Sequence, residues 1–215
     1  MNSKKLDLET AELVIKNYVN EWQKIMDDSV YNECCKNIIK NQIGKDTDVE
    51  TIKCFLYVWG RMGRVLGRKE FKSWEERLAL EITANRERLV DFRKMELLKT
   101  DLEKYEHAIK RCYDAFCNIL GPIAAVKTLH LFCPTFFPLW DNAIADAFRS
   151  ERLPTAEKIS SFSSGDYYAF MKDVKSFAIQ YVDVLSALAK EYNEEILRII
   201  DEFAWLITHR PLSVF

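Results

Sequence analysis

Apolar residues recur at the spacing of an α-helix along almost the whole chain. Such a stripe of apolar side chains is typical of a helix with one face against a core. Glycine and proline, which all-β folds need for their many tight turns, number only 6 and 5 among 215 residues. The sequence therefore predicts an all-α protein. Two clear stripes are Leu13, Val14, Tyr18, Trp22 and Ile25, and Ile196, Ile199, Ile200, Phe203 and Ile207.

Helix start and stop signals divide the first half of the chain. Residues 47–50 (Thr-Asp-Val-Glu) and 73–76 (Ser-Trp-Glu-Glu) match the capping box, in which the two side chains satisfy each other's free backbone amides. We expect one helix to run from Thr47 through Leu66 and another from Ser73 toward Asp91. A third is expected over residues 100–120, and Gly121 with Pro122 ends it.

The segment after this stop differs from the rest. Residues 124–131 have a helical pattern, but Pro134 and Pro138 cannot continue it, because proline lacks the amide and restricts the residue before it. Helix is expected again over 142–148, so that Asp141 stands at a helix start after an apolar loop. Pro154 and residues 160–165 predict a loop before a last long helical region over 166–209.

Charge and hydropathy exclude several functional classes. The formal net charge is −2, so nucleic-acid binding would have to come from a local basic patch. No apolar run reaches the roughly 20 residues that span a bilayer. The first residues, Met-Asn-Ser-Lys-Lys, lead into a polar stretch and not into an apolar signal core. We therefore expect a cytoplasmic protein with no membrane partner.

The six cysteines have two interpretations. Cys112, Cys117, His130 and Cys133 could supply four ligands to zinc or to an iron–sulfur cluster. Zinc sites favour closer cysteine pairs, however, and a Gly-Pro break separates Cys117 from His130. We expect reduced, metal-free cysteines that pack as small core residues, and no cofactor.

Two charged residues in apolar surroundings are candidates for chemistry. Asp141 follows Phe137-Pro138-Leu139-Trp140, where a carboxylate must be capped, paired or used. It could simply cap the helix that follows, or it could also face a pocket. Lys127 lies in a largely apolar helix. If it is buried, desolvation would lower its pKa and make it a nucleophile; otherwise its stem packs and its amine reaches solvent.

A second candidate is a basic strip at residues 60–72. If these residues are helical, Arg61, Arg64, Arg68 and Lys72 share one face, beside a bare stripe of Gly60, Gly63 and Gly67. Three glycines in a helix interior cost about 1 kcal/mol each relative to alanine, which suggests a steric reason for them. The strip predicts either phosphate contacts or a solvated face beside tight helix packing.

Residues 124–141 carry a resemblance to a known group. The run Ala-Ala-Val-Lys-Thr-Leu-His-Leu-Phe-Cys-Pro-Thr-Phe-Phe-Pro-Leu-Trp-Asp resembles an S-K-x-L-H-F-x-x-P-x-x-F-P-I-x-D signature of uncharacterised prokaryotic proteins. Residues 196–205 resemble their L-R-x-L-D-x-x-L-W element. That group is distantly similar to the helix-hairpin-helix (HhH-GPD) base-excision DNA glycosylases. In that family a hairpin holds the DNA backbone, a lysine forms a Schiff base in bifunctional members, and an aspartate is essential.

The resemblance implies a fold and a set of site residues. The fold would be a two-lobed helical domain over 1–215, with lobes at about 30–120 and about 121–215 plus the N-terminal helix. Lys127 matches the family lysine, Asp141 the aspartate, and Gly121 the start of the hairpin. The implied protein binds double-stranded DNA and acts as a base-excision DNA glycosylase or lyase. Phe137 and Trp140 would stack on the flipped base.

Two other functional classes stay open. A helical scaffold or interaction module would use Lys127 and Asp141 only for packing and capping. The slightly acidic net charge favours this class. A metal-binding helical protein would use the cysteines and His130.

Overall fold

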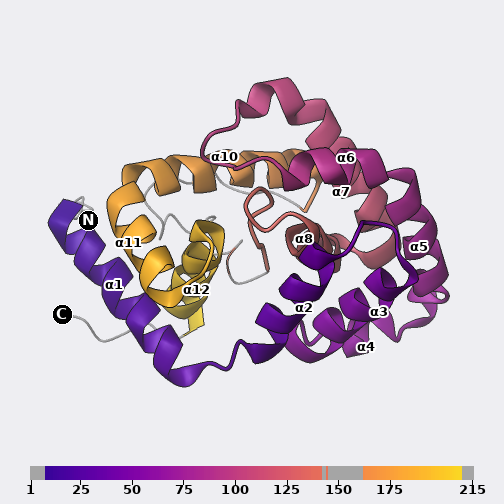
Figure 1. Cartoon of the computed structure of the whole chain (residues 1–215), viewed down its shortest axis with the longest axis horizontal. Coiled ribbons are helices and arrows are strands. Elements are labelled where there is room, and N and C mark those ends of the chain that lie inside the picture. The colour runs from indigo at the N-terminus through magenta and orange to yellow at the C-terminus, as the bar shows by residue number, and fades with distance from the viewer. Residues whose placement is uncertain (1–7, 142–143, 145–161, 210–215) are drawn as a thin grey trace.

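The computed structural model describes residues 8–141, 144 and 162–209, and these form helices and connecting loops without a strand (Figure 1). This confirms the all-α prediction. No helix among them has both the length and the apolar character needed to cross a membrane. In chain order the elements are α1 (Leu8–Ile25), α2 (Ser29–Lys40), α3 (Asp46–Cys54), the π-helical turn η1 (Phe55–Trp59), α4 (Gly63–Leu66), the 3₁₀ turn η2 (Lys69–Phe71), α5 (Trp74–Ala84), α6 (Arg86–Arg93), the 3₁₀ turn η3 (Leu102–Tyr105), α7 (Glu106–Leu120), α8 (Pro122–Phe132), α10 (Ser164–Gln180), α11 (Val182–Tyr192) and α12 (Ile196–His209).

The helices form two groups that share one apolar core (Figure 1). In the first, α7 packs against α8 and α5, and α2 packs against α3, η1 and α8. In the second, α12 packs against α1 and α11. Helix α10 joins them, because it contacts α7 as well as α11 and α12. Helix α8 thus lies with the first group, on the other side of the lobe boundary expected near residue 121.

The expected long helix from Thr47 through Leu66 is wrong. Helix α3 starts at Asp46, and Asp48 accepts hydrogen bonds from the amides of Gly44 and Lys45 (2.7 and 3.2 Å), so Thr47 is not the cap. The helix then widens into the π-helical turn η1 and ends at Gly60. Arg61 follows with φ +52°, a conformation that does not continue an α-helix.

Three other expected helices are interrupted. Ser73 does precede α5, but its φ is +56° and its side chain makes no capping hydrogen bond, so the second capping box is also wrong. The pattern toward Asp91 divides at Asn85, and the one over 166–209 divides at Tyr181 and Asn193. The N-terminal part of the third forms η3 before α7 begins. The expected helix over 142–148 and the loop residues 154 and 160–161 lie outside the described residues, Ile144 excepted.

Candidate functional site

Lys127 lies half-buried on α8, between the buried Val126 and Thr128. Its ammonium Nζ is 4.9 Å from the centre of the Trp59 ring and 3.4 Å from the carbonyl oxygen of Gly60. None of the ion pairs among the described residues includes this lysine. Burial lowers its pKa below the ordinary value, and the negative charge of Asp141 counteracts this in part.

Asp141 ends the apolar loop that follows α8. Its Oδ1 accepts a hydrogen bond from the amide of Ile144 (2.9 Å), as the capping interpretation predicts. The side chain is partly exposed, and it lines the same cavity as Lys127. A carboxylate and an amine with a lowered pKa therefore share one solvent-reachable space.

The cavity has a volume of about 460 Å³. Its walls come from four parts of the chain: residues 60–71, the α7–α8 junction with the first half of α8, Asp141 after the loop that follows α8, and the end of α12. Gly121, with φ +76°, is at its wall, where backbone of this shape suits glycine. The lining residues are Gly60, Met62, Val65, Phe71, Leu120, Gly121, Pro122, Ile123, Lys127, Asp141 and His209.

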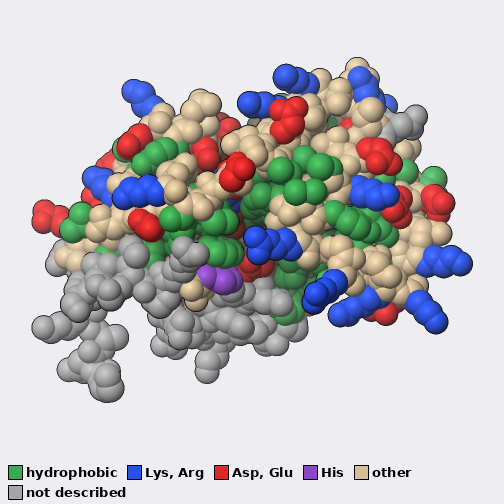
Figure 2. Space-filling model, turned by 90° about the horizontal axis from the view of Figure 1, so that it is seen from below, with side chains coloured by type: hydrophobic (Ala, Val, Ile, Leu, Met, Phe, Trp, Pro, Cys, Tyr) green, Lys and Arg blue, Asp and Glu red, His purple; other side chains and the backbone are tan. Residues whose placement is uncertain are grey.

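The basic strip does not form one helical face. η1 ends at Gly60, where only glycine fits, because a Cβ would lie 2.8 Å from the carbonyl oxygen of Leu56. The chain continues through α4 and η2 along the cavity wall, and the basic side chains point into solvent. Lysine and arginine side chains gather at this end of the molecule in the view from below (Figure 2). The exposed basic residues of this segment are Arg61, Arg64, Arg68, Lys69 and Lys72.

Phe137 and Trp140 do not face the cavity. Their exposed fractions are 0% and 1%, and both rings pack against Tyr167 of α10. The expectation that they stack on a base is therefore wrong: the proline-bounded loop folds its aromatic side chains into the core. The aromatic ring beside Lys127 belongs to Trp59 instead.

His130 and the cysteines do not assemble into a metal centre among the described residues. His130 is fully buried, with Nε2 2.7 Å from the Tyr31 hydroxyl and Nδ1 2.7 Å from the Phe137 carbonyl oxygen, so both ring nitrogens are engaged. Burial lowers its pKa to about 4. Of the cysteines, Cys54 is exposed and Cys117 half-buried, whereas Cys34, Cys35, Cys112 and Cys133 are buried.

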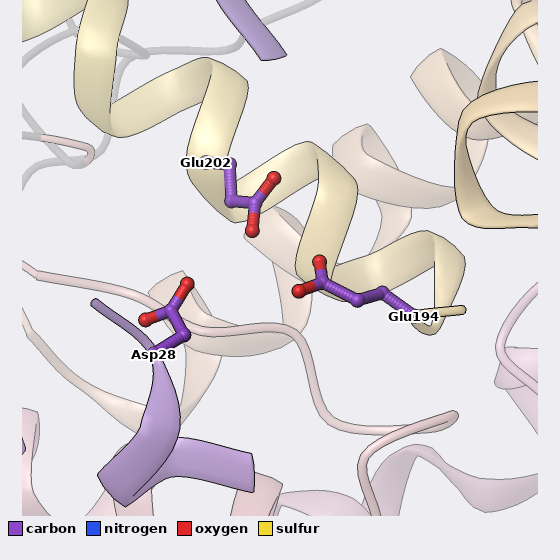
Figure 3. A group of neighbouring side chains, drawn as sticks. All are labelled: Asp28, Glu194 and Glu202. Atoms are coloured by element: carbon purple, nitrogen blue, oxygen red, sulfur yellow. The ribbon is translucent and has the colours of Figure 1, made fainter. Parts of the chain in front are cut away.

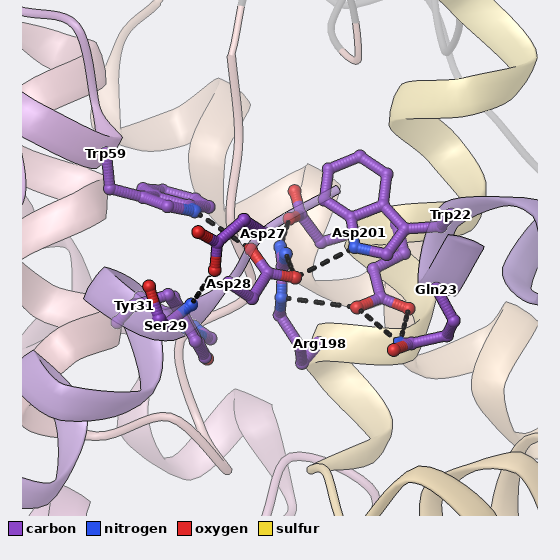
Figure 4. Close-up of polar contacts among 11 residues, drawn as sticks. Trp22, Gln23, Asp27, Asp28, Ser29, Tyr31, Trp59, Arg198 and Asp201 are labelled. Carbon is purple, nitrogen blue, oxygen red and sulfur yellow. Dashed lines mark hydrogen bonds and ion pairs between the residues drawn. The ribbon is translucent and has the colours of Figure 1, made fainter. Parts of the chain in front are cut away.

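A buried arginine lies on the ring of Trp59, the same ring that Lys127 contacts, and Figure 4 shows its polar partners. Arg198 of α12 is fully buried and pairs with Asp28 (2.6 Å), Asp201 and Glu202 (3.5 Å). The centre of its guanidinium group is 4.6 to 5.3 Å from three ring centres. These rings belong to Tyr31, Trp22 and Trp59. We call Arg198, Asp28, Asp201 and Glu202 the Arg198 cluster.

Carboxylates outnumber the cation in this cluster. Glu194 lies beside it, and Figure 3 shows its side chain, from the α11–α12 connection, converging with that of Glu202 from α12 and that of Asp28 from the α1–α2 connection. One oxygen of each lies within 4.8 Å of the others. Because Arg198 already pairs with Asp28 and Glu202, its guanidinium group supplies positive charge at this place. Burial raises the pKa of Asp201 to about 6 and that of Glu202 to about 10.

Three residues at or beside the cavity are not singled out by the sequence. Trp59 lies within the segment expected to be helical from Thr47 through Leu66, where it has the pattern of an ordinary apolar residue. His209 lines the cavity at the end of α12 and stacks on Trp205 at 4.1 Å, an i, i+4 pair that the sequence displays. Arg198 was part of the second matched element, but nothing in the sequence showed that it is buried.

No family model, curated protein or solved structure matches the chain. Its function has to be inferred from the geometry of its own residues.

Proposed function

We propose that the protein binds double-stranded DNA and excises a damaged base with Lys127 and Asp141. The observation that carries this proposal is their position: both line one cavity that Gly121 and the start of α8 also border. The family resemblance requires a lysine and an aspartate at one pocket beside a hairpin turn. The α7–Gly121–α8 turn has that order along the chain.

The chemistry assigned to the two side chains follows from their charges. A base flipped into the cavity would bring its sugar C1′ between them. The carboxylate of Asp141 would stabilise the positive charge that develops at C1′ as the bond to the base breaks. The neutral amine of Lys127 would form a bond to C1′ while the base leaves with the bonding electron pair, and the proton that the attacking nitrogen loses would go to the departing base. Breaking of the bond between C1′ and the ring oxygen, whose electron pair takes up a proton, would then leave the Schiff base that borohydride reduces. A lowered lysine pKa favours this step, because more of the amine is neutral at pH 7.

The surface around the cavity supports a polyanionic partner. Basic side chains of residues 61–72 project next to the cavity wall. The start of α8 adds backbone amides at a helix N-terminus, although Pro122 removes one of them. The overall charge of −2 makes this local concentration the attractive feature for phosphates.

The decisive experiment is borohydride trapping on damaged duplexes. Uracil, 8-oxoguanine and alkylated-base duplexes are incubated with the protein in the presence of borohydride, and covalent complexes are counted on a denaturing gel. We expect a complex with wild type and none with Lys127→Gln. Lys110→Gln is the matched control, because Lys110 is also a half-buried helical lysine but pairs with Glu106 away from the cavity.

Asp141→Asn separates capping from catalysis. Asparagine caps a helix about as well as aspartate, so the variant should stay folded. If the charge acts on the sugar, base release should fall by two orders of magnitude or more, on the scale of about 10²–10³ seen when one stabilising group is removed. Wild-type protein that neither binds nor cleaves any of these duplexes would exclude the proposed enzyme and favour a helical interaction module.

A further inference from the structure

The π-helical turn η1 places Trp59 between two cations. The ring centre is 4.9 Å from the Lys127 ammonium and 5.3 Å from the Arg198 guanidinium carbon. Helix α8 and helix α12, which carry these cations, belong to the two different groups of helices. Trp59 therefore contacts both Lys127, which lines the cavity, and Arg198 of the Arg198 cluster.

The indole ring is fixed from several sides. Its Nε1 donates a hydrogen bond to Asp28 Oδ1 (3.2 Å), and the other carboxylate oxygen of Asp28 pairs with Arg198 at 2.6 Å. The ring stacks on Phe55 with centres 4.8 Å apart and planes 8° apart, and it leans on Tyr31 at 5.4 Å. Figure 4 shows the indole pointing toward Asp28. A ring held this way has one orientation.

The π-helical turn η1 brings the Trp59 ring and the carbonyl group of Gly60 next to Lys127. The amide of Gly60 bonds to the carbonyl of Phe55, five residues earlier, and not to that of Leu56. Lys127 contacts two groups that the π-helical turn positions: the face of the Trp59 ring and the carbonyl oxygen of Gly60. Single π turns inside helices frequently occur at functional sites, because they cost stability that regular helix would keep.

We propose that Trp59 is a positioning residue for Lys127, and that Asp28 and Arg198 act on the lysine by holding the indole in place. The proposal deepens the proposed function and rests on it for the role of the amine as nucleophile. The ring face attracts the ammonium form and holds the amine at the cavity wall. The second matched sequence element, around Arg198, thereby serves the same site as the first.

The test measures the amine itself, without DNA. Purified protein is acetylated with trace acetic anhydride at a series of pH values, and labelling of Lys127 is read by peptide mass spectrometry relative to the exposed Lys104. The inflection of the labelling curve reports protonation of the amine, and its plateau reports accessibility. The charged groups that also affect the pKa of Lys127 are Asp141, Asp201, Arg198 and Arg61.

Trp59→Leu removes the ring and should move the inflection to lower pH. Plateau-normalised labelling below the inflection should then rise about two- to five-fold, the value of one cation–π contact. Trp59→Phe keeps a ring face, so its inflection should lie closer to that of wild type. Trp74→Phe, a buried tryptophan that stacks on Tyr57, is the control and should change neither quantity.

An unchanged inflection in folded Trp59→Leu would overturn the proposal, and a change in plateau alone would mean that the ring only shields the lysine. Thermal unfolding establishes that each variant is folded. If Trp59→Leu does not fold, Trp59→Met, which fills more of the space but also lacks a ring, takes its place: an inflection displaced to lower pH supports the proposal, and an unchanged one overturns it. A displaced inflection together with failed borohydride trapping would keep the positioning role and exclude the glycosylase.

Discussion

Arg198 and Lys127 are two helical cations that share the ring of Trp59, yet their surroundings are opposite. Arg198 has carboxylates of Asp28, Asp201 and Glu202 around it and is closed off from water. Lys127 has an aromatic face and a carbonyl oxygen, and its amine borders an open cavity. The protein thus places its buried negative charge around the cation that cannot titrate. The one that can titrate is left without an ion pair among the described residues.

The largest effect should follow from removing the paired cation. Arg198→Met removes the cation that pairs with Asp28, Asp201 and Glu202, the last two of which are buried, so we expect the free energy of unfolding to fall by about 3–5 kcal/mol. Urea denaturation measures this. Arg111→Met, at an exposed arginine of α7, is the control and should change stability by no more than about 0.5 kcal/mol. A decrease as small as the control's would mean that the cluster does not stabilise the fold.

A second effect concerns Asp201, the cluster carboxylate whose charge also acts on Lys127. Its pKa in the folded protein is about 6, above the ordinary value, so the folded state binds the proton more tightly than the unfolded chain does. Stability from this group is therefore present below about pH 4 and lost as the pH rises to 6. By linkage the loss amounts to about 3 kcal/mol.

Asp201→Asn makes this measurable. The difference in unfolding free energy between variant and wild type should change in favour of the variant between pH 4 and pH 6. Chemical denaturation at five pH values across that range measures it, with Asp183→Asn on exposed α11 surface as the control. Parallel curves would show that Asp201 is already ionised throughout the range.

A smaller effect is expected at the unpaired cation. Lys127→Met removes a charge that burial already disfavours, so the free energy of unfolding should change by about 1 kcal/mol or less. The measurement is the same denaturation series as for Arg198→Met. If the two methionine variants were destabilised equally, the contrast between a structural and a reactive cation would not hold.

The smallest effect on stability should come from the exposed basic side chains. Arg61, Arg64 and Arg68 changed together to glutamine should unfold at a free energy within about 0.5 kcal/mol per site of wild type. Affinity for duplex DNA should fall, and the slope of log affinity against log salt should decrease by about one for each phosphate that the variant no longer neutralises. An unchanged slope would leave these residues as a solvated surface.

The sequence predicted the helical class and singled out Lys127 and Asp141, because both depend on short-range patterns, but it did not predict that the two residues share a cavity. Lys127 stands out in an apolar helix, and Asp141 stands out before a helix start; the structure places both at one cavity. The Arg198 cluster could not be predicted in this way. Arg198, Asp201 and Glu202 have the spacing of an ordinary polar helix face, and their burial depends on α1 and the α1–α2 connection.

Local signals also misled at two places. The three glycines of residues 60–67 were interpreted as a stripe on one helix, but Gly60 marks the end of a π-helical turn, for which no sequence rule exists. Phe137 and Trp140 lie in a proline-containing loop, for which a surface position is the usual outcome. Their bulk fills the space beside Tyr167 instead, since burial of large aromatic rings contributes more than exposure at a loop.

The order of synthesis gives the Arg198 cluster a further consequence. Asp28 and Arg198 are 170 residues apart in the chain, and Gln23, which bonds Glu202, is 179 residues from it. At ribosomal rates of about 5–20 residues per second, Asp28 waits on the order of 10–30 s for its partner to be made. During that time Asp28, which accepts a hydrogen bond from the Trp59 indole, has no guanidinium partner. A nascent chain stalled before α12 would therefore contain Asp28, Trp59 and Lys127 but not the buried cation that pairs with the first and contacts the second.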